Sequence, residues 1–185
     1  MYILCDLDGT LIDTDKANYL AYKEAVSKIK KIDLVYNYNK RFTRDTLKLV
    51  LPNLSVKEFD EIIKIKTDIF QNYLEYTKLN IKFINYIKQI SKNNNIILAT
   101  NSHRKKADLL LKHYNIFNLF DMRYYKESYI YHENNKYAYI FNDIKVDVNK
   151  ILIFEDNINE IEKAIKLHVS PNHIINIRNR DSLYE

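Results

Sequence analysis

Three short apolar runs predict the buried strands of a sheet. Residues 2–5 (YILC), 96–99 (IILA) and 151–154 (ILIF) contain no charged position. A strand that is covered on both faces of a parallel sheet need not alternate between apolar and polar residues. Two weaker runs, at 122–125 and 174–177, predict a further short strand and a last strand.

Between these runs, apolar residues recur at helical spacing. The expected helices cover residues 15–31, 43–51, 55–76, 81–91, 104–113, 137–144 and 159–167. Four of them, and no strand, stand between the first two apolar runs. Strands that are joined by helical crossovers predict an α/β fold with a Rossmann-like three-layer parallel sheet.

The helices between the first two strands are too many for one crossover. We therefore expect an inserted α-helical cap domain at residues 15–82. The α/β core would then comprise residues 1–14 and 83–185. We assign no structure from residue 126 to Asn135, a polar and aromatic segment.

Composition changes this picture little. The 185 residues are 46% hydrophobic and 29% charged, which is typical of a globular protein with a core. We find no apolar run of membrane-spanning length and no signal-peptide pattern. Cys5 is the only cysteine, so an internal disulfide is excluded and we expect a reducing, cytoplasmic location.

A net charge of +5 raises the question of nucleic-acid or membrane contact. The lysines are spread over helix faces, and the excess of Ile, Lys, Asn and Tyr reflects AT-rich codons. We therefore expect neither nucleic acid nor a membrane as partner, and a monomer or weak dimer.

The first strand ends in two carboxylates, Asp6 and Asp8. Such a pair repels unless a group of opposite charge neutralises it, most simply a divalent cation. Gly9 follows, and it is the only glycine of the chain, which indicates a backbone position that a side chain would obstruct. The alternative is a strand that ends in an Asp-rich turn.

All three buried strands end in polar residues, and the carboxyl ends of parallel strands meet at one edge of the sheet. Carboxylates from two strands suit Mg²⁺, and a neutral hydroxyl-bearing turn between them suits a phosphate oxygen. The residues concerned are Asp6, Asp8, Thr100, Asn101, Glu155 and Asp156.

Three segments resemble motifs of the haloacid dehalogenase superfamily of phosphohydrolases. Residues 6–14 (DLDGTLIDT) resemble its first motif, 97–102 (ILATNS) its second and 154–157 (FEDN) its fourth. The resemblance covers nearly the full length of the chain and implies the HAD-like fold.

The third motif of this family is a lysine, and Lys136 fits it best by position. Relatives usually have Gly before this lysine and Pro after it, and neither is present here. Asn135 could replace the glycine in a left-handed turn. Lys126 is the competing candidate, and Lys136 could instead be a solvated surface lysine.

The resemblance implies a mechanism. Asp6 is expected to be the nucleophile that forms an aspartyl-phosphate, with Asp8 as general acid and then base. Mg²⁺ is the expected cofactor, held by Asp6, Asp156 and the backbone carbonyl of Asp8. Thr100 and Lys136 would hold phosphoryl oxygens. The dehalogenating branch lacks the second aspartate, so Asp8 favours phosphate transfer.

Further contacts with substrate are expected from Gly9, Thr10 and Asn101. Two acids have open roles. Glu155 is either a water-mediated metal contact or a structural acid. Glu160 could face the metal, but we expect it to face solvent.

The segment 15–82 resembles the helical cap of the phosphoglycolate phosphatase and β-phosphoglucomutase branch. Arg44 and Lys66 stand where cap cations of relatives reach substrate, although either could be a surface charge. Asn18 replaces a histidine of mutase relatives, which argues mildly against a mutase.

The leading hypothesis is therefore a Mg²⁺-dependent phosphatase that hydrolyses a small phosphorylated metabolite. A phosphomutase of the β-phosphoglucomutase type uses the same chemistry. The positive charge and the many tyrosines leave a nucleic-acid-end phosphatase or nucleic-acid binder as a different class. An inactive family member that serves in interaction also stays open.

Overall fold

The computed structural model describes residues 1–35, 41–129 and 135–177, and the chain forms two compact units. Unit 1 comprises Met1–Asp13 and Lys78–Glu185, and unit 2 comprises Thr14–Thr77. The expected cap ran from 15 to 82, so unit 2 begins one residue earlier and ends five residues earlier. The sequence between the expected helices 15–31 and 43–51 favours a polar linker at 33–40, and part of it lies outside the described residues.

Unit 1 is built on a five-stranded parallel sheet in the order β5-β4-β1-β6-β7. The strands are β1 (Tyr2–Cys5), β4 (Asn95–Ala99), β5 (Met122–Tyr124), β6 (Ile151–Glu155) and β7 (Ile174–Asn176). The three apolar runs form the three central strands of the sheet, which lie between the two layers of helices. The predicted α/β class with a three-layer parallel sheet is therefore confirmed.

The three central strands are aligned with one another at their C-terminal ends. Cys5 of β1 stands beside Leu98 of β4 on one side and beside Phe154 of β6 on the other. The residue after each of these positions therefore lies at the same edge of the sheet. This alignment brings Asp6 and Glu155 to neighbouring places, although 148 residues of the sequence separate them.

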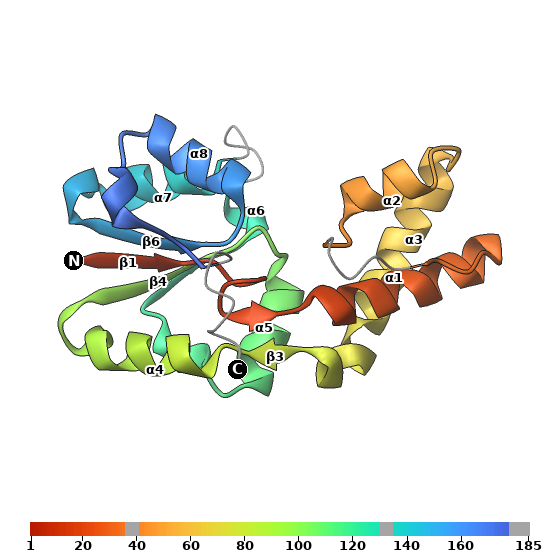
Figure 1. Ribbon diagram of the computed structural model, residues 1–185, viewed down its shortest axis with the longest axis horizontal. Helices are drawn as coiled ribbons and strands as arrows, with labels where there is room; N and C mark the ends of the chain where they lie inside the picture. Colours follow the sequence, from red (N-terminus) through yellow and green to blue (C-terminus); the bar gives the residue numbers. More distant parts are fainter. Residues whose placement is uncertain (36–40, 130–134, 178–185) are drawn as a thin grey trace. The chain divides into compact units, whose positions relative to one another are not determined.

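Helices cover both faces of the sheet (Figure 1). The helices of unit 1 are α4 (Ile81–Ile90), α5 (Arg104–His113), α6 (Lys126–Tyr129), α7 (Lys136–Ile144) and α8 (Ile158–Lys166). Short 3-10 turns lie at Ser91–Asn93, Phe117–Leu119, Val148–Lys150 and Pro171–His173. Figure 1 shows α7 and α8 on one face of the sheet and α4 and α5 on the other. The short helix α6 falls in the segment to which the sequence assigned no structure.

Each face has its own apolar contacts. Tyr137 and Ile140 of α7 pack in one cluster with the β1 and β6 residues Leu4 and Ile153. On the opposite face, the ring of Phe83 in α4 lies 4.6 Å from the ring of Phe154. Burying these side chains supplies the main driving force for the layered fold.

Two short strands escaped the sequence pattern. β2 (Ile12–Asp13) and β3 (Lys78–Leu79) form an antiparallel pair, so the expectation of no strand between β1 and β4 was wrong. Each has two residues, too few for a detectable alternation. Their pairing joins residues far apart in the sequence, which local patterns cannot predict.

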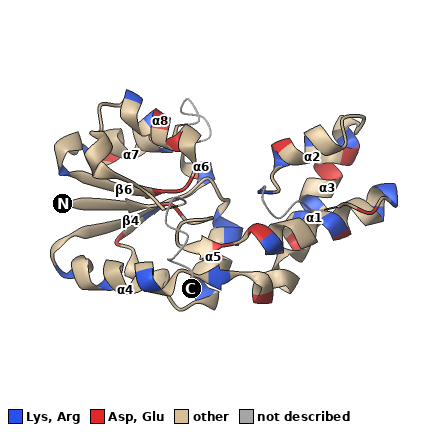
Figure 2. Cartoon of the chain, viewed as in Figure 1, with Lys and Arg blue, Asp and Glu red and all other residues tan. Residues whose placement is uncertain are grey.

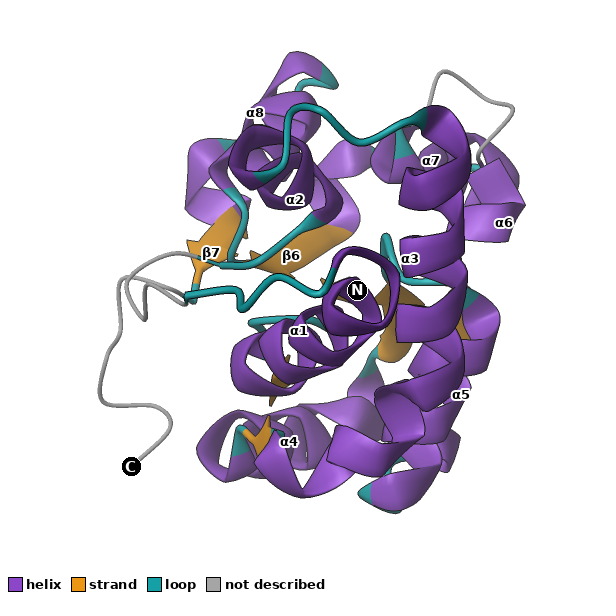
Figure 3. Ribbon diagram, turned by 90° about the vertical axis from the view of Figure 1, so that its right-hand side faces the viewer, coloured by secondary structure: helices purple, strands orange, loops and turns teal. Residues whose placement is uncertain are grey.

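Unit 2 consists of helices and loops in its described part (Figure 3). It contains α1 (Asp15–Lys30), α2 (Arg44–Val50), α3 (Val56–Ile69) and the 3-10 helix η1 (Phe70–Tyr76). The expected helix 55–76 thus tightens into a 3-10 helix after Ile69. Its apolar cluster is built around Tyr19, Val26, Leu47 and Ile62.

Lys and Arg lie on helices of both units, including α1, α4, α5 and α8 (Figure 2). Within the described ranges, no helix is both long and apolar enough to cross a membrane. The expectation that nucleic acid is not a partner stays a prediction.

The capping box at the start of α3 provides a test of local stability. Ser55 Oγ accepts from the backbone N–H of Glu58 at 3.3 Å, and the Glu58 side chain accepts from the backbone N–H of Ser55 at 2.9 Å. We expect Ser55→Ala to lower the free energy of unfolding by about 1 kcal/mol, because it removes the N-cap acceptor. Urea unfolding followed by circular dichroism measures this change. Ser27→Ala, inside α1, is the control and should leave stability within about 0.5 kcal/mol of the parent.

Candidate active site

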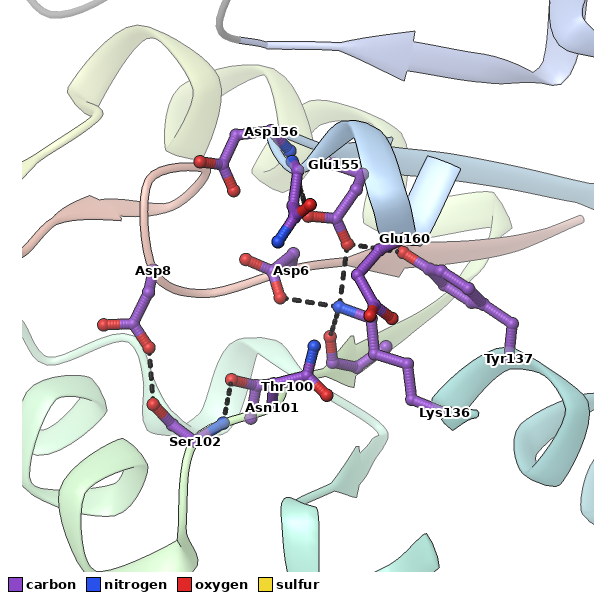
Figure 4. A network of polar contacts seen from close by, with 12 residues as sticks. Asp6, Asp8, Thr100, Asn101, Ser102, Lys136, Tyr137, Glu155, Asp156 and Glu160 are labelled. Carbon is purple, nitrogen blue, oxygen red and sulfur yellow. Dashed lines mark hydrogen bonds and ion pairs between the residues drawn. The ribbon is translucent and has the colours of Figure 1, made fainter. Parts of the chain in front are cut away.

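The carboxylate of Asp6 lies directly after β1 and contacts a buried ammonium group (Figure 4). Lys136 Nζ donates to Asp6 Oδ1 at 2.7 Å and to Glu155 Oε2 at 2.7 Å. It donates a third hydrogen bond to the backbone carbonyl oxygen of Ala99 at 2.9 Å. The three donors of this ammonium thus link β1, β4 and β6 at one edge of the sheet.

Lys136 reaches this place because it is the first residue of α7. Asn135 caps the helix, and its side-chain oxygen accepts from the backbone N–H groups of Tyr137 and Ala138. The backbone of Asn135 is extended, with φ −118°, so the expected left-handed turn was wrong. The lysine is 0% exposed, which excludes the surface alternative.

The competing candidate, Lys126, is the first residue of α6. Its backbone N–H donates to the carbonyl oxygen of Ser102 at 3.1 Å. The ammonium group that pairs with Asp6 belongs to Lys136. The geometry therefore favours Lys136 as the third-motif lysine.

Both oxygens of Glu155 are engaged. Oε2 accepts from Lys136 and from the hydroxyl of Tyr137, each at 2.7 Å. Oε1 accepts from the backbone N–H groups of Asp156 and Asn157, each at 3.0 Å. Of the two roles left open by the sequence, this arrangement favours the structural acid.

The buried cluster of Asp6, Lys136, Glu155 and Asp156 contains more acidic than basic groups. Burial and the Glu155 carboxylate raise the pKa of Asp6 well above its ordinary value, and the Lys136 ammonium opposes them. Burial alone would lower the pKa of Lys136, but the carboxylates of Asp6 and Glu155 outweigh it and raise that pKa. Burial would raise the pKa of Glu155, yet Lys136 holds it below its usual range. Three buried acids thus share one ammonium group, and the raised pKa of Asp6 reflects negative charge around it that Lys136 does not fully compensate.

A metal cation fits this excess charge. Carboxylate oxygens of Asp6, Glu155 and Asp156 lie within 4.8 Å of one another, and all three residues are buried. Hard divalent cations such as Mg²⁺ prefer oxygen ligands of this kind. With the oxygens of Glu155 engaged, Asp6 and Asp156 are the carboxylates that could hold the ion.

Gly9 makes room for one of these carboxylates. A Cβ atom at Gly9 would stand 2.3 Å from Asp156 Oδ2, and the backbone has φ +91°. Both facts exclude an ordinary side chain. The prediction that a side chain would obstruct this position is confirmed. The N–H of Gly9 donates to the carbonyl oxygen of Ile12 at 2.8 Å, so it is already engaged within the turn.

The second carboxylate of the first motif, Asp8, lies beside the loop that follows β4. Its Oδ2 accepts from Ser102 Oγ at 2.5 Å, and its Oδ1 contacts Lys106 Nζ at 2.5 Å. Thr100 Oγ1 in turn accepts from the backbone N–H of Ser102 at 3.0 Å. Thr10 is buried in the turn that follows Asp8.

A buried tyrosine anchors the loop that carries the second motif. The hydroxyl of Tyr129 contacts the carbonyl oxygen of Thr100 at 3.0 Å and the side-chain oxygen of Asn101 at 2.5 Å. Asn101 itself is exposed. The loop therefore presents Thr100 and Asn101 from a fixed backbone.

Sequence reasoning missed four residues of this network, namely Ser102, Lys106, Tyr129 and Tyr137. Ser102 stands within the second motif, and Lys106 lies about one helical turn beyond it, so spacing could have suggested both. The two tyrosines carry no local signal, because tyrosine is common throughout this chain.

Glu160 corrects another expectation. Its side chain is 7% exposed and pairs with Lys163 at 2.7 Å, so the expected solvent-facing position was wrong. It adds a further carboxylate near the cluster, where it raises the pKa of Lys136.

The remaining predicted residues belong to unit 2. Lys66 is buried, donates to Asn18 Oδ1 at 2.7 Å and lies over the ring of Phe70 at 4.9 Å. A surface position for Lys66 is thereby excluded. Arg44 is exposed and lies near Tyr22, where burial raises the pKa of the tyrosine to about 12 and Arg44 opposes that rise. Contact of Arg44 or Lys66 with substrate stays a prediction.

A sequence model of the family described as haloacid dehalogenase-like hydrolase matches residues 3–171. The chain belongs to this family. The match spans both units, and the resemblance drawn from the three motifs is confirmed. The comparison with curated proteins found no match.

Solved structures of haloacid dehalogenase-like proteins share this fold. CbbY from Rhodobacter sphaeroides, in complex with phosphate, has a TM-score of 0.74 and 16% identity, over 91% of this chain and 83% of that one. A candidate β-phosphoglucomutase from Thermotoga maritima has a TM-score of 0.69 and 20% identity, over 95% and 85%. A candidate phosphoglycolate phosphatase from Lactobacillus plantarum has a TM-score of 0.67 and 14% identity, over 91% and 83%.

The ion pair at the centre of the site generates a prediction for stability. Lys136→Met leaves the buried carboxylates of Asp6 and Glu155 without their cation, and we expect it to lower the free energy of unfolding by about 3–5 kcal/mol. Adding Glu155→Gln should recover part of this loss, because one buried negative charge is removed as well. Urea unfolding in the presence of EDTA measures both variants.

Lys150→Met, at an exposed position, is the matched control and should behave like the parent. A Lys136→Met variant as stable as the parent, or a double variant less stable than the single one, would contradict this account of the charges.

Proposed function

We propose that this protein is a Mg²⁺-dependent phosphatase that hydrolyses a small phosphomonoester through an aspartyl-phosphate on Asp6. The observation that carries the proposal is the buried contact between Asp6 and Lys136 beside Asp156. It joins a nucleophile, a cation for phosphoryl oxygens and a metal-binding carboxylate at one edge of the sheet. CbbY, which shares the fold, holds phosphate in one structure and, as a variant, xylulose-1,5-bisphosphate in another.

In the first step, an oxygen of Asp6 attacks phosphorus and the ester bond to the leaving oxygen breaks. Lys136 holds Oδ1 of this carboxylate, which leaves Oδ2 as the attacking oxygen. Asp8 donates its proton to the leaving oxygen, so the product departs as an alcohol.

In the second step, water attacks the phosphorus of the aspartyl-phosphate. Asp8, now a carboxylate, takes a proton from this water, and the bond between phosphorus and Asp6 breaks. Phosphate leaves, Asp6 is free again, and Asp8 carries its proton for the next turnover.

Asp6, Asp156 and the backbone carbonyl of Asp8 are the groups that would hold Mg²⁺. When bound, the ion offsets the repulsion between these carboxylates and the phosphate dianion. Thr100 holds a phosphoryl oxygen, and Lys136, whose three donors are engaged, stabilises the negative charge that spreads over the phosphoryl group through its own positive charge.

The remaining substrate contacts are assigned by position. Asn101 follows Thr100 in the second motif and Thr10 follows Gly9 in the first, and we assign both to the phosphoryl oxygens as well. Gly9 contributes the space in which the Asp156 carboxylate lies. The cap residues Arg44 and Lys66 select the leaving group, since cap domains that close over a site exclude water and set specificity.

Activity against a panel of phosphomonoesters, with Mg²⁺ or with EDTA, tests the proposal. The parent should release phosphate only with Mg²⁺, and Asp6→Asn should lower kcat by a factor of roughly 10³ or more, because the nucleophile is lost. Asp60→Asn, at an exposed position of α3, is the control and should retain full activity.

Equal rates for the parent and Asp6→Asn would refute the assignment of the nucleophile. Conversion of a sugar phosphate into its isomer, without free phosphate, would identify a phosphomutase instead.

Metal binding has a readout that is independent of turnover. Mg²⁺ at about 100 times its dissociation constant should stabilise the parent by about 2.7 kcal/mol, since it binds the folded state alone. Asp156→Asn should abolish this stabilisation. Gly9→Ala should weaken Mg²⁺ binding roughly 10- to 100-fold, because its Cβ displaces the Asp156 carboxylate. Thermal unfolding at increasing MgCl₂, with NaCl at equal ionic strength as control, measures all three proteins.

A further inference from the structure

The carboxylate of Asp8 is held at both oxygens by side chains of the segment that follows β4. Ser102 Oγ donates to Oδ2 at 2.5 Å, and Lys106 Nζ pairs with Oδ1 at 2.5 Å. The side chain of Asp8 is 11% exposed and that of Lys106 15%. The pair is therefore largely shielded from water and from screening by salt.

The segment that carries these two groups is itself anchored. The carboxylate of Glu127 accepts from the backbone N–H of Arg104 at 3.1 and 3.2 Å, and it contacts His103 Nδ1 at 2.9 Å. The carbonyl oxygen of Ser102 accepts from the backbone N–H of Lys126 at 3.1 Å. The start of α5 is thus fixed against α6, and Lys106 extends toward Asp8 from a supported helix.

Such an arrangement determines where the carboxyl group lies. A carboxylate held at one oxygen can rotate, whereas one held at both cannot rotate without breaking a contact. Each carboxylate oxygen has two acceptor positions, so Asp8 keeps the capacity to exchange a proton while Ser102 and Lys106 hold it. Displacement of a reacting group by about 1 Å can lower a rate by about 10²-fold.

We propose that Lys106 is a positioning residue that acts on the reaction through Asp8. This inference rests on the proposed function, in which Asp8 gives a proton to the leaving oxygen and takes one from water. Lys106 fixes the carboxyl group for both transfers, and its positive charge lessens the repulsion between Asp8 and the phosphoryl group. Its ammonium group pairs with Asp8, so its influence is directed at the acid and base.

The experiment compares Lys106→Met and Lys106→Arg with the parent, each with Asp8 intact and with Asp8→Asn. Two substrates are used in Mg²⁺, an alkyl phosphate and p-nitrophenyl phosphate. The leaving group of the second is stable as an anion and depends little on protonation. Lys105→Met, at the exposed neighbouring position of α5, is the matched control.

We expect Lys106→Met to lower kcat for the alkyl phosphate by about 10- to 100-fold with KM nearly unchanged. The loss should be smaller for p-nitrophenyl phosphate, and Lys106→Arg should restore most of the activity. In the Asp8→Asn background, Lys106→Met should have no further effect, since a residue that acts through Asp8 is silent once Asp8 is lost. Lys105→Met should equal the parent.

Three results would overturn the proposal. The first is full activity of Lys106→Met. The second is a rise in KM at unchanged kcat, which would make Lys106 a substrate ligand. The third is a loss of kcat on Lys106→Met that is as large in the Asp8→Asn background as in the parent. Failure of the proposed function has a different signature. The parent would then lack a Mg²⁺-dependent phosphatase activity that is lost in Asp6→Asn. That last outcome would refute both.

Discussion

One ammonium group organises the candidate active site of this haloacid dehalogenase-like protein. Lys136 Nζ lies between the carboxylates of Asp6 and Glu155 and contacts the carbonyl oxygen of Ala99, with no exposure to solvent. A buried ion pair of this kind is weak evidence for stability, because both charges have left water. Its physical consequence is geometric: it joins three strand ends and fixes the orientation of Asp6.

The same edge carries an excess of negative charge that the lysine does not balance. The parallel register brings the acids of β1 and β6 together, and the single glycine of the chain leaves space for the carboxylate of Asp156. Glu155 is engaged by Lys136, Tyr137 and two backbone N–H groups. A cation could balance the charge that remains, and this is the basis of the proposed Mg²⁺-dependent phosphatase.

Much of the site could be predicted because its acids follow strands whose apolar runs are visible in the sequence. Asp6, Asp8 and Asp156 were placed at one edge by this argument alone. The partners of these acids could not be predicted, since Tyr137 and Lys106 lie on helices whose approach depends on packing. Likewise, the pattern alone could not separate a buried lysine from a solvated one.

The sequence by itself determined the strands of the parallel sheet, most of the helices, the α/β class and the meeting of acids at one sheet edge. These follow from local periodicity and from the rule that parallel strands share a direction. Only the tertiary structure decided that Lys136 is buried, that Asn135 caps α7 in an extended conformation and that Glu160 is buried. The tertiary structure also decided the pairing of β2 with β3. Each of these depends on contacts between residues distant in the chain, whose energies no local pattern contains.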